Sequence, residues 1–332
     1  MVSAELRDRV IERLNEDPTG ADIKFSLFFA AANNYRHDTV LRPFPPMFLN
    51  ANGEKDFRKL AKVCKEILPV QRLLHVSDQS IMGSQAWQLM DWVLSTKAFT
   101  LKSHGTAKFE EIKQLTGAPS YDVEPTHIYE IHPNSVSDTK FEELRDCRDL
   151  LYAYHGSRVE NFHSILHNGL HAHMNKNSLF GEGTYLSSDL SVTMPYAPAG
   201  KGWDDSCIGD LLSCIAVCEM IDHPDVKCTT KDSKNNVIRS RAQAPSSMGG
   251  DVPDKYYIVT NNEVLRVKYL LVYASRTVKP RAAAAQSSRL LTWMKNHQVA
   301  MVMIGYMLIL LFIGFMNSSA YKVFMRKYLG IR

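Results

Sequence analysis

One stretch near the C-terminus constrains this 332-residue chain more than any other feature. Between Lys295 and Lys322 there is no charged residue, and the 18 residues Val299–Met316 are all apolar, Gly or Tyr. At about 1.5 Å per residue, a helix of this length spans ~27 Å, close to the thickness of a hydrocarbon core. A core helix or an amphipathic surface helix of this length normally keeps a polar face. The stretch therefore predicts a single transmembrane helix over residues 298–316.

The N-terminal residues predict the orientation of that helix. Residues 1–17 are charged and amphipathic and lack the apolar core of a signal peptide. The numbers of basic residues on the two sides of the predicted span are equal, so the positive-inside rule does not determine the orientation of the helix. We expect a tail-anchored protein with its bulk in the cytosol, a short lumenal tail over residues 317–332 and six cysteines as free thiols. The expected location is the endoplasmic reticulum membrane, with the nuclear envelope that continues it. The basic tail leaves the mitochondrial outer membrane as the alternative.

The remainder has the composition of a globular protein, with 45% hydrophobic and 22% charged residues. A net charge of +4 is too slight to indicate nucleic-acid binding. Residues 1–95 carry apolar residues at helical spacing and predict a helical domain with a packing or regulatory role. The expected helices cover residues 4–15, 21–35, 55–68 and 84–94.

From residue 96 the pattern changes to short runs of Tyr, Val, Ile and Leu between turn residues, which predicts a β-rich domain over residues 96–281. The fold class is therefore α+β. A polar loop over residues 227–251, a linker over residues 282–297 and a helix over residues 160–166 complete the prediction. The expected strands cover residues 127–131, 150–155, 183–186, 212–219, 256–260 and 269–273.

Three motifs in the β-rich domain point to chemistry. Residues 154–158 (YHGSR) place an imidazole and a hydroxyl beside an unhindered backbone, whose N–H and C=O groups can bond a carboxamide. Residues 180–188 (FGEGTYLSS) predict a tight turn that presents Tyr185, and Tyr196 follows. Two tyrosine faces can sandwich a planar ring, each gaining roughly 1 kcal/mol beyond burial. Residues 255–260 (KYYIVT) and 266–273 (RVKYLLVY) predict two core strands. Taken singly, each motif also fits an ordinary strand end or hairpin turn.

In order and spacing, these segments resemble the catalytic domain of the poly(ADP-ribose) polymerase family, the diphtheria-toxin-like ADP-ribosyltransferases, over about residues 96–281. The helical N-terminal half, the C-terminal apolar stretch and the segment SLFGEGTYLSSDLS extend the resemblance to a tail-anchored member of that family, which transfers a single ADP-ribose at the endoplasmic reticulum. The resemblance implies an enzyme whose substrate is NAD.

The resemblance also implies roles for individual residues. His155 would hold the ribose of NAD, and Tyr185 would stack on the nicotinamide ring. Gly156 would bond the nicotinamide amide through its backbone. The other implied contacts to NAD come from Ser157, Tyr196, Asn161 and Thr193.

Tyr256 stands at the third implied catalytic position, where this chain departs from the family. Polymerising members carry a Glu there, and counting back from Tyr269 of the Lys-Tyr-Leu-Leu strand leads to Tyr256, while Asp254 and Glu263 are out of register. A carboxylate can orient the ribose and activate an incoming ribose hydroxyl, whereas a phenol is a poor base at neutral pH. Chain elongation should fail while a single transfer survives, so we expect mono-ADP-ribosylation.

We expect no metal site, because the cysteines lack the common zinc spacing and Cys214 and Cys218 lie in an apolar strand. The histidines at 163, 167, 171 and 173 are expected on a helix surface. The expected partners are acceptor proteins on the same membrane, including signalling receptors, and the chain itself, with no nucleic acid. The alternatives are a catalytically weak module that senses NAD or ADP-ribose, and a membrane tether whose helical half recruits partners.

Overall fold

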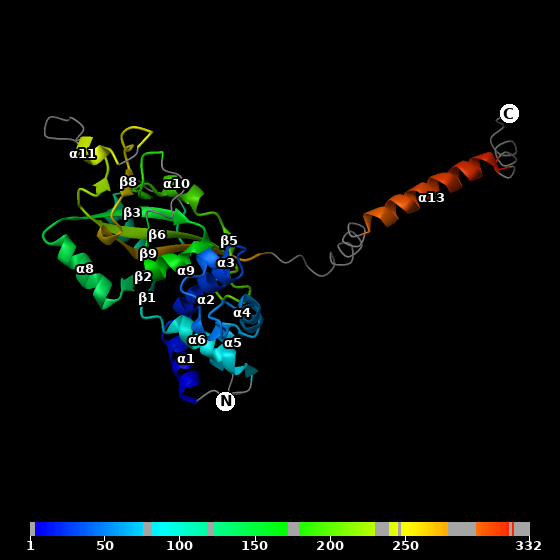
Figure 1. Ribbon diagram of the computed structural model, residues 1–332, viewed down its shortest axis with the longest axis horizontal. Coiled ribbons are helices and arrows are strands. Elements are labelled where there is room, and N and C mark those ends of the chain that lie inside the picture. Colours follow the sequence, from blue (N-terminus) through cyan, green and yellow to red (C-terminus); the bar gives the residue numbers. More distant parts are fainter. Residues whose placement is uncertain are drawn as a thin grey trace. The chain divides into compact units, whose positions relative to one another are not determined.

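The computed structural model describes residues 4–75, 81–117, 123–171, 179–229, 239–244, 247–277, 297–318 and 321. The chain divides into two compact units, residues 1–277 and residues 278–332. The first unit combines a cluster of helices with a sheet, as Figure 1 shows. The sheet has nine strands among the described residues. The predicted α+β class is therefore confirmed for this unit.

The helices of the N-terminal segment begin where the sequence places capping residues. Asp17 caps α2 by accepting a hydrogen bond from the Gly20 N–H at 2.7 Å, and Pro18 is the first helical residue. Asp56 caps α4 in the same way, accepting from the Lys59 N–H at 2.9 Å. These caps place the starts of both helices a few residues away from the predicted ones. The helices are α1 (Ala4–Glu16), α2 (Pro18–Ala32), α3 (His37–Val40), η1 (Pro46–Phe48), α4 (Phe57–Cys64), α5 (Val70–His75) and α6 (Ser84–Leu94).

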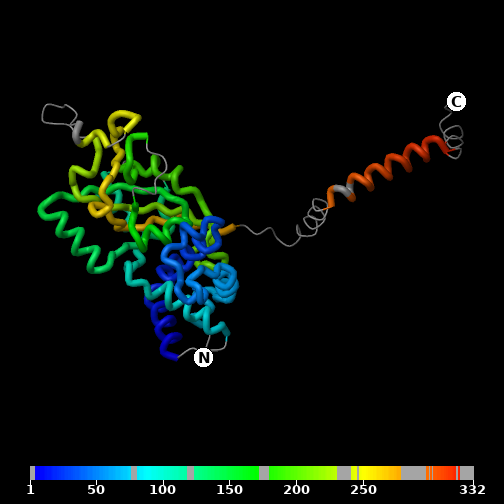
Figure 2. The backbone as a smooth tube through the Cα atoms, viewed as in Figure 1, coloured from blue at the N-terminus to red at the C-terminus, as the bar shows by residue number. Residues whose placement is uncertain are grey.

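Helix α2 is buried on nearly every side, and it joins the helices to the sheet. Phe25 and Phe28 pack in the core shared by the N-terminal helices, while Ile23 and Leu27 pack in the core that covers one face of the sheet. The one buried carboxylate of α2, Asp22, accepts the Cys207 N–H at 2.7 Å and also a hydrogen bond from the Ser206 hydroxyl. Since α2 belongs to both cores, the N-terminal helices and the sheet pack as one body, and Figure 2 follows the chain from the blue helices into the sheet.

The sheet is antiparallel, with the order β1-β2-β9-β6-β3-β4-β8-β7 and with β5 paired to β6. The long central strand β6 and the middle of β9, residues 269–272, are largely apolar and buried, as expected of strands covered on both faces. All six predicted strands are present, and the structure adds β1, β5 and β7. The strands are β1 (Phe99–His104), β2 (His127–Pro133), β3 (Leu150–Ser157), β4 (Thr184–Ser187), β5 (Gly200–Lys201), β6 (Leu211–Ile221), β7 (Val226–Lys227), β8 (Tyr256–Val259) and β9 (Leu265–Ser275).

Two sets of short helices cover the two faces of the sheet. Phe162 and Leu166 of α9 and Phe141 of α8 pack on the same face as α2. Phe109 of α7 and Leu190 of α10 pack on the opposite face. The second set includes the helices beside the candidate site. These elements are α7 (Lys108–Thr116), α8 (Ser135–Arg145), η3 (Val159–Asn161), α9 (Phe162–Asn168), α10 (Leu190–Thr193), η5 (Met194–Tyr196), α11 (Arg239–Ala242) and η6 (Asn262–Val264).

The structure corrects the prediction that the histidines of α9 lie on a helix surface. His163 is 4% exposed, and its Nε2 donates to the Pro43 carbonyl oxygen at 3.1 Å. It packs edge-on against Phe28 of α2, because this side of α9 faces the N-terminal helices rather than solvent. His173 lies outside the described residues. All six cysteines are free, and Cys214 and Cys218 are fully buried, as predicted.

The second unit contains helix α13 (Gln298–Asn317). Within the part of the chain that the structure describes, no helix is long and apolar enough to cross a membrane. The transmembrane helix predicted over residues 298–316 therefore stays a prediction. Nearly all of the predicted linker and tail, and the middle of the predicted loop over residues 227–251, lie outside the described residues.

Candidate active site

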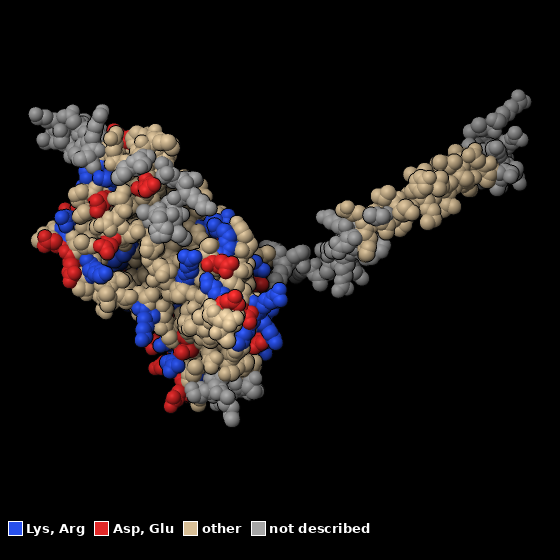
Figure 3. Space-filling view, in the orientation of Figure 1, with Lys and Arg blue, Asp and Glu red and all other residues tan. Residues whose placement is uncertain are grey.

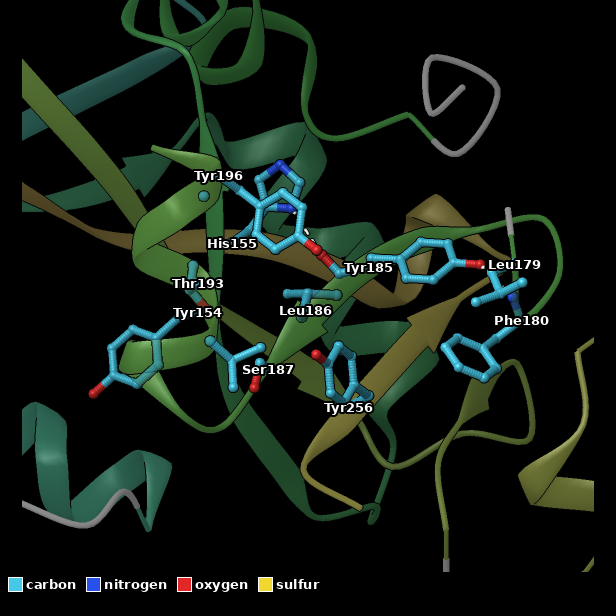
Figure 4. Close-up of a pocket in the computed structure, with 12 residues that line it drawn as sticks. Tyr154, His155, Leu179, Phe180, Tyr185, Leu186, Ser187, Thr193, Tyr196 and Tyr256 are labelled. Carbon is cyan, nitrogen blue, oxygen red and sulfur yellow. Dashed lines mark hydrogen bonds between the residues drawn. The ribbon is translucent and has the colours of Figure 1, made fainter. Parts of the chain in front are cut away.

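A cavity of about 370 Å³ lies at the end of β3, between β4, β8 and the α10–η5 segment. Figure 4 shows the side chains that surround it. The structure brings together six of the eight predicted site residues, which come from four separate segments of the chain. The residues lining the cavity are Tyr154, His155, Gly156, Leu179, Phe180, Tyr185, Leu186, Ser187, Val192, Thr193, Tyr196 and Tyr256.

The cavity exists because β3 and β4 separate. Among the described residues, β3 pairs with β4 at one position, Tyr154 opposite Ser187. Beyond Tyr154 the backbone of β3 no longer pairs with β4. Its other edge continues to pair with β6, and Gly156 lies opposite Ile215. The backbone around His155 and Gly156 is therefore held rigidly on one side and open to the cavity on the other.

His155 is held as a neutral hydrogen-bond acceptor. Its Nδ1 lies 2.9 Å from the carbonyl oxygen of Tyr185, and since a carbonyl oxygen can only accept, Nδ1 carries the proton. Burial lowers the pKa of His155 below its ordinary value of 6.5, and the bond to Tyr185 offsets this in part. The neutral ring has a lone pair on Nε2, which can accept a hydrogen bond from a ligand hydroxyl.

Tyr185 presents the face of its ring because its hydroxyl is already engaged. The hydroxyl donates to the Gly181 carbonyl oxygen at 2.7 Å and accepts from the Phe180 N–H at 3.1 Å. Burial also raises the pKa of the Tyr185 hydroxyl, which keeps the proton on the oxygen. Gly181 makes this turn possible, because its φ of +104° is one that side-chain-bearing residues rarely adopt. The phenol is thus an oriented stacking surface for a planar ring.

Gly156 is required by the close approach of the opposite wall. A Cβ at this position would lie 2.5 Å from the Thr193 carbonyl oxygen and 3.1 Å from the Tyr196 Cβ. The α10–η5 segment therefore packs directly on the glycine backbone. Thr193 is buried, while Tyr196 is 64% exposed and stands at the mouth of the cavity.

Tyr256 lines the cavity from the first position of β8, opposite Ser187 of β4. Asp254 is exposed and precedes the strand, and Glu263 lies in η6; neither lines the cavity. Among the described lining residues there is no carboxylate and no Lys or Arg. The site therefore offers a stacking face and uncharged hydrogen-bonding groups, but no general base beside Tyr256.

Ser157 and Asn161 are the two predicted site residues that do not line this cavity. They bond each other instead, the Asn161 Nδ2 donating to the Ser157 Oγ at 2.9 Å. Their contacts to NAD stay predictions. Conversely, the predicted site lacked six residues that line the cavity: Tyr154, Leu179, Phe180, Leu186, Ser187 and Val192. Ser187 was predictable, because it lies two residues after Tyr185 in the same strand and therefore on the same face. Leu179 and Phe180 precede that strand and reach the cavity from a turn, which the strand pattern does not predict.

The geometry is that of a pocket without charged residues in its described lining, in which the Tyr185 ring, the open backbone at Gly156 and a neutral imidazole acceptor can receive a planar ring that carries a carboxamide. These are the features of an enzyme that cleaves nicotinamide from NAD. Comparison with known families agrees, since the Poly(ADP-ribose) polymerase catalytic domain matches residues 106–275 and the ARTD15 N-terminal domain matches residues 12–94. The chain belongs to the poly(ADP-ribose) polymerase family.

Individual relatives narrow the class. The chain is 48% identical over 317 residues to the human protein mono-ADP-ribosyltransferase PARP16, covering 94% of this chain and 95% of the relative. The mouse PARP16 is 47% identical over 316 residues, with the same coverage. The mouse protein mono-ADP-ribosyltransferase PARP8 is 25% identical over 263 residues, covering 65% of this chain and 30% of the relative. The predicted activity, NAD-dependent mono-ADP-ribosyl transfer, is thereby confirmed.

If His155 holds the ribose as the resemblance implies, its neutral state predicts a pH dependence of NAD binding. We expect binding to be constant above pH 6.5 and to weaken at lower pH, since the pKa of His155 lies below that value and protonation of Nε2 removes the acceptor. Calorimetric titration of NAD at a series of pH values measures the effect. In His155→Gln, the amide oxygen accepts without titrating, so the remaining binding should lose this dependence. The same acid limb in that variant would contradict the assignment.

Proposed function

We propose that this protein transfers one ADP-ribose from NAD to side chains of acceptor proteins, including itself, and releases nicotinamide. The observation that carries the proposal is the cavity itself, which combines the His155 acceptor and the Tyr185 ring with a Tyr in place of a carboxylate at position 256. The names of the relatives, protein mono-ADP-ribosyltransferases, support the same reaction and the same acceptor class.

The chemistry follows from the groups present. The bond between the ribose C1′ and the nicotinamide nitrogen breaks through an oxocarbenium-like state, and nicotinamide leaves with the electron pair. A lone pair of the acceptor forms the new bond to C1′, and the acceptor proton passes to solvent. His155 holds a ribose hydroxyl, and Tyr185 keeps the leaving ring in place. Because the cavity provides no base beside Tyr256 to activate a second ribose, the reaction stops after one transfer.

We also propose that residues 298–316 anchor the protein in the endoplasmic reticulum membrane, with residues 1–277 in the cytosol and the tail in the lumen. The support is the uncharged apolar sequence, together with the side chains of α13, most of which are exposed and apolar. The sequence of α13 contains no Lys, Arg, Asp or Glu, and the face of this helix that Figure 3 shows has no charged residue. Anchoring raises the local concentration of proteins on the same membrane, so these are the proposed acceptors, signalling receptors among them.

The activity is tested on the full-length protein in detergent with labelled NAD, with wild type beside His155→Ala and Tyr185→Ala. A sharp labelled band and free nicotinamide, both lost in the two variants, are expected. A high-mass smear would show that chains are made and that Tyr256 does not prevent elongation. NAD binding without nicotinamide release would show a sensor instead of an enzyme.

The location is tested separately in cells. Alkaline carbonate should leave the protein in the membrane fraction, and external protease should digest residues 1–277 of microsomal protein while sparing a lumenal epitope placed at the C-terminus. Release by carbonate, or full protection of residues 1–277, would overturn the anchored, cytosol-facing arrangement.

A further inference from the structure

An ion pair outside the cavity links two of its walls. Lys255 directly precedes Tyr256, and its Nζ lies 2.9 Å from the Oδ2 of Asp189. Asp189 directly precedes α10, which provides Val192 and Thr193 to the cavity. Neither Asp189 nor Lys255 lines the cavity, so any effect of the pair on the reaction acts through its neighbours.

Asp189 organises the α10 wall through several hydrogen bonds. Its Oδ1 accepts from the Ser191 N–H at 3.0 Å and from the Ser191 hydroxyl at 2.6 Å. Its carbonyl oxygen accepts from the Thr193 hydroxyl at 3.3 Å. The bonds from Ser191, with the contribution of Lys255, lower the pKa of Asp189, so the carboxylate stays ionised near neutral pH. Asp189 thus caps the start of the segment whose backbone carries Thr193 and Tyr196.

Lys255 holds an uncommon backbone conformation at the start of β8. Its φ is +68°, in the left-handed region that residues other than Gly, Asn and Asp rarely adopt. Its carbonyl oxygen accepts a hydrogen bond from the Ser188 N–H at 2.9 Å. Its side chain is 54% exposed and contacts Asp189. An exposed ion pair contributes little to overall stability. The pair does connect the turn from which Tyr256 enters the sheet to the residue that precedes α10.

We propose that the Asp189–Lys255 pair positions Tyr256 against the α10–η5 wall, and so sets where the acceptor side chain meets the bound NAD. The inference rests on the proposed transfer function. Asp189 and Lys255 are positioning residues, since both act through Tyr256 and α10. The pair contacts none of His155, Gly156 and Tyr185, the residues proposed to hold the ribose and the nicotinamide ring. Loss of the pair should therefore change transfer much more than binding.

The variant Lys255→Gly separates the positioning effect of the ion pair from an effect on folding stability. Glycine adopts a φ of +68° without strain, and it removes the charge of Lys255. In the full-length protein we expect an unchanged or higher melting temperature and a KM for NAD within about twofold of wild type. We expect kcat for protein labelling to fall about tenfold, as misplacement of reacting groups predicts. Free ADP-ribose should rise relative to protein-bound label, since water replaces the misplaced acceptor.

Three further variants complete the test. Asp189→Asn keeps the acceptor for the Ser191 N–H and loses the charge, so it should show the same kinetic change. Lys255→Arg keeps the pair and should label like wild type. Lys201→Met breaks another exposed pair, Lys201 Nζ to Asp204 Oδ1, also at 2.9 Å, away from the cavity, and should have no effect.

The outcomes separate this inference from the function on which it rests. Wild-type rates and product ratios in Lys255→Gly and Asp189→Asn would overturn the positioning role and leave the transfer function standing. A lower melting temperature with a parallel loss of binding and labelling would show a structural role and also overturn it. Absence of nicotinamide release from the wild type would overturn the proposed function, and the inference with it.

Discussion

Gly156→Ala is expected to abolish NAD binding and to lower protein labelling by at least ~100-fold. The added Cβ would lie 2.5 Å from the Thr193 carbonyl oxygen, an atom of the main chain that no side-chain rotation can move. The α10–η5 segment would have to shift away from β3, and Tyr196 would move with it. Shifts of about 1 Å are enough to produce losses of this size when they displace groups that orient the reacting atoms.

The matched control for this prediction is Gly105→Ala. A Cβ at Gly105 meets no atom within 4 Å, so binding and labelling should equal those of wild type. The melting temperature of Gly156→Ala should fall modestly, since overpacking costs about 1–3 kcal/mol and β3 remains paired with β6. Isothermal titration with NAD and quantitative gel labelling measure both variants. Retained NAD affinity in a folded Gly156→Ala protein would contradict the assignment of Gly156 to the site.

The motifs that define the site were predictable because they are local. A glycine beside His155 marks a strand end, and the Gly181-Glu182-Gly183 turn marks the entry to a strand that carries Tyr185. Period-two alternation then predicts that Tyr185 and Ser187 lie on one face of β4. The departure at Tyr256 came from the family resemblance instead, by counting back from Tyr269 of β9 to the position in β8 where polymerising members carry a Glu.

Other parts of the structure depend on packing that no short segment encodes. Strand β1 is paired in register with β2, yet its sequence, FTLKSH, alternates apolar and polar residues over only its first four positions, which is too short to predict a strand by itself. Helix α8 has a single buried residue, Phe141, so it gives almost no helical apolar pattern. His163 was expected at the surface because sequence spacing cannot show that the N-terminal helices cover α9.

Helix α8 is instead held by charge, which leads to the second large prediction. Arg266 of β9 lies over the Phe141 ring at 3.9 Å and pairs with Asp138 at 2.5 Å and with Glu142 at 3.0 Å. Its Nε also donates to Glu219 of β6, which is 2% exposed. Arg266→Met should destabilise the fold by about 3–5 kcal/mol, because it leaves the carboxylate of Glu219 buried without a cation.

A second substitution shows whether the uncompensated charge of Glu219 causes the loss of stability in Arg266→Met. If the uncompensated charge dominates, Arg266→Met combined with Glu219→Gln should be more stable than Arg266→Met alone, because the neutral amide can still accept the hydrogen bond that Glu219 receives from the Tyr152 hydroxyl at 3.2 Å. Arg145→Ala, which removes one exposed pair with Glu142, is the control and should leave the unfolding midpoint unchanged. Urea unfolding followed by circular dichroism measures all four proteins. A double variant no more stable than Arg266→Met would contradict the buried-charge explanation, and the loss in Arg266→Met would then come from the lost pairs with α8 and the lost packing on Phe141.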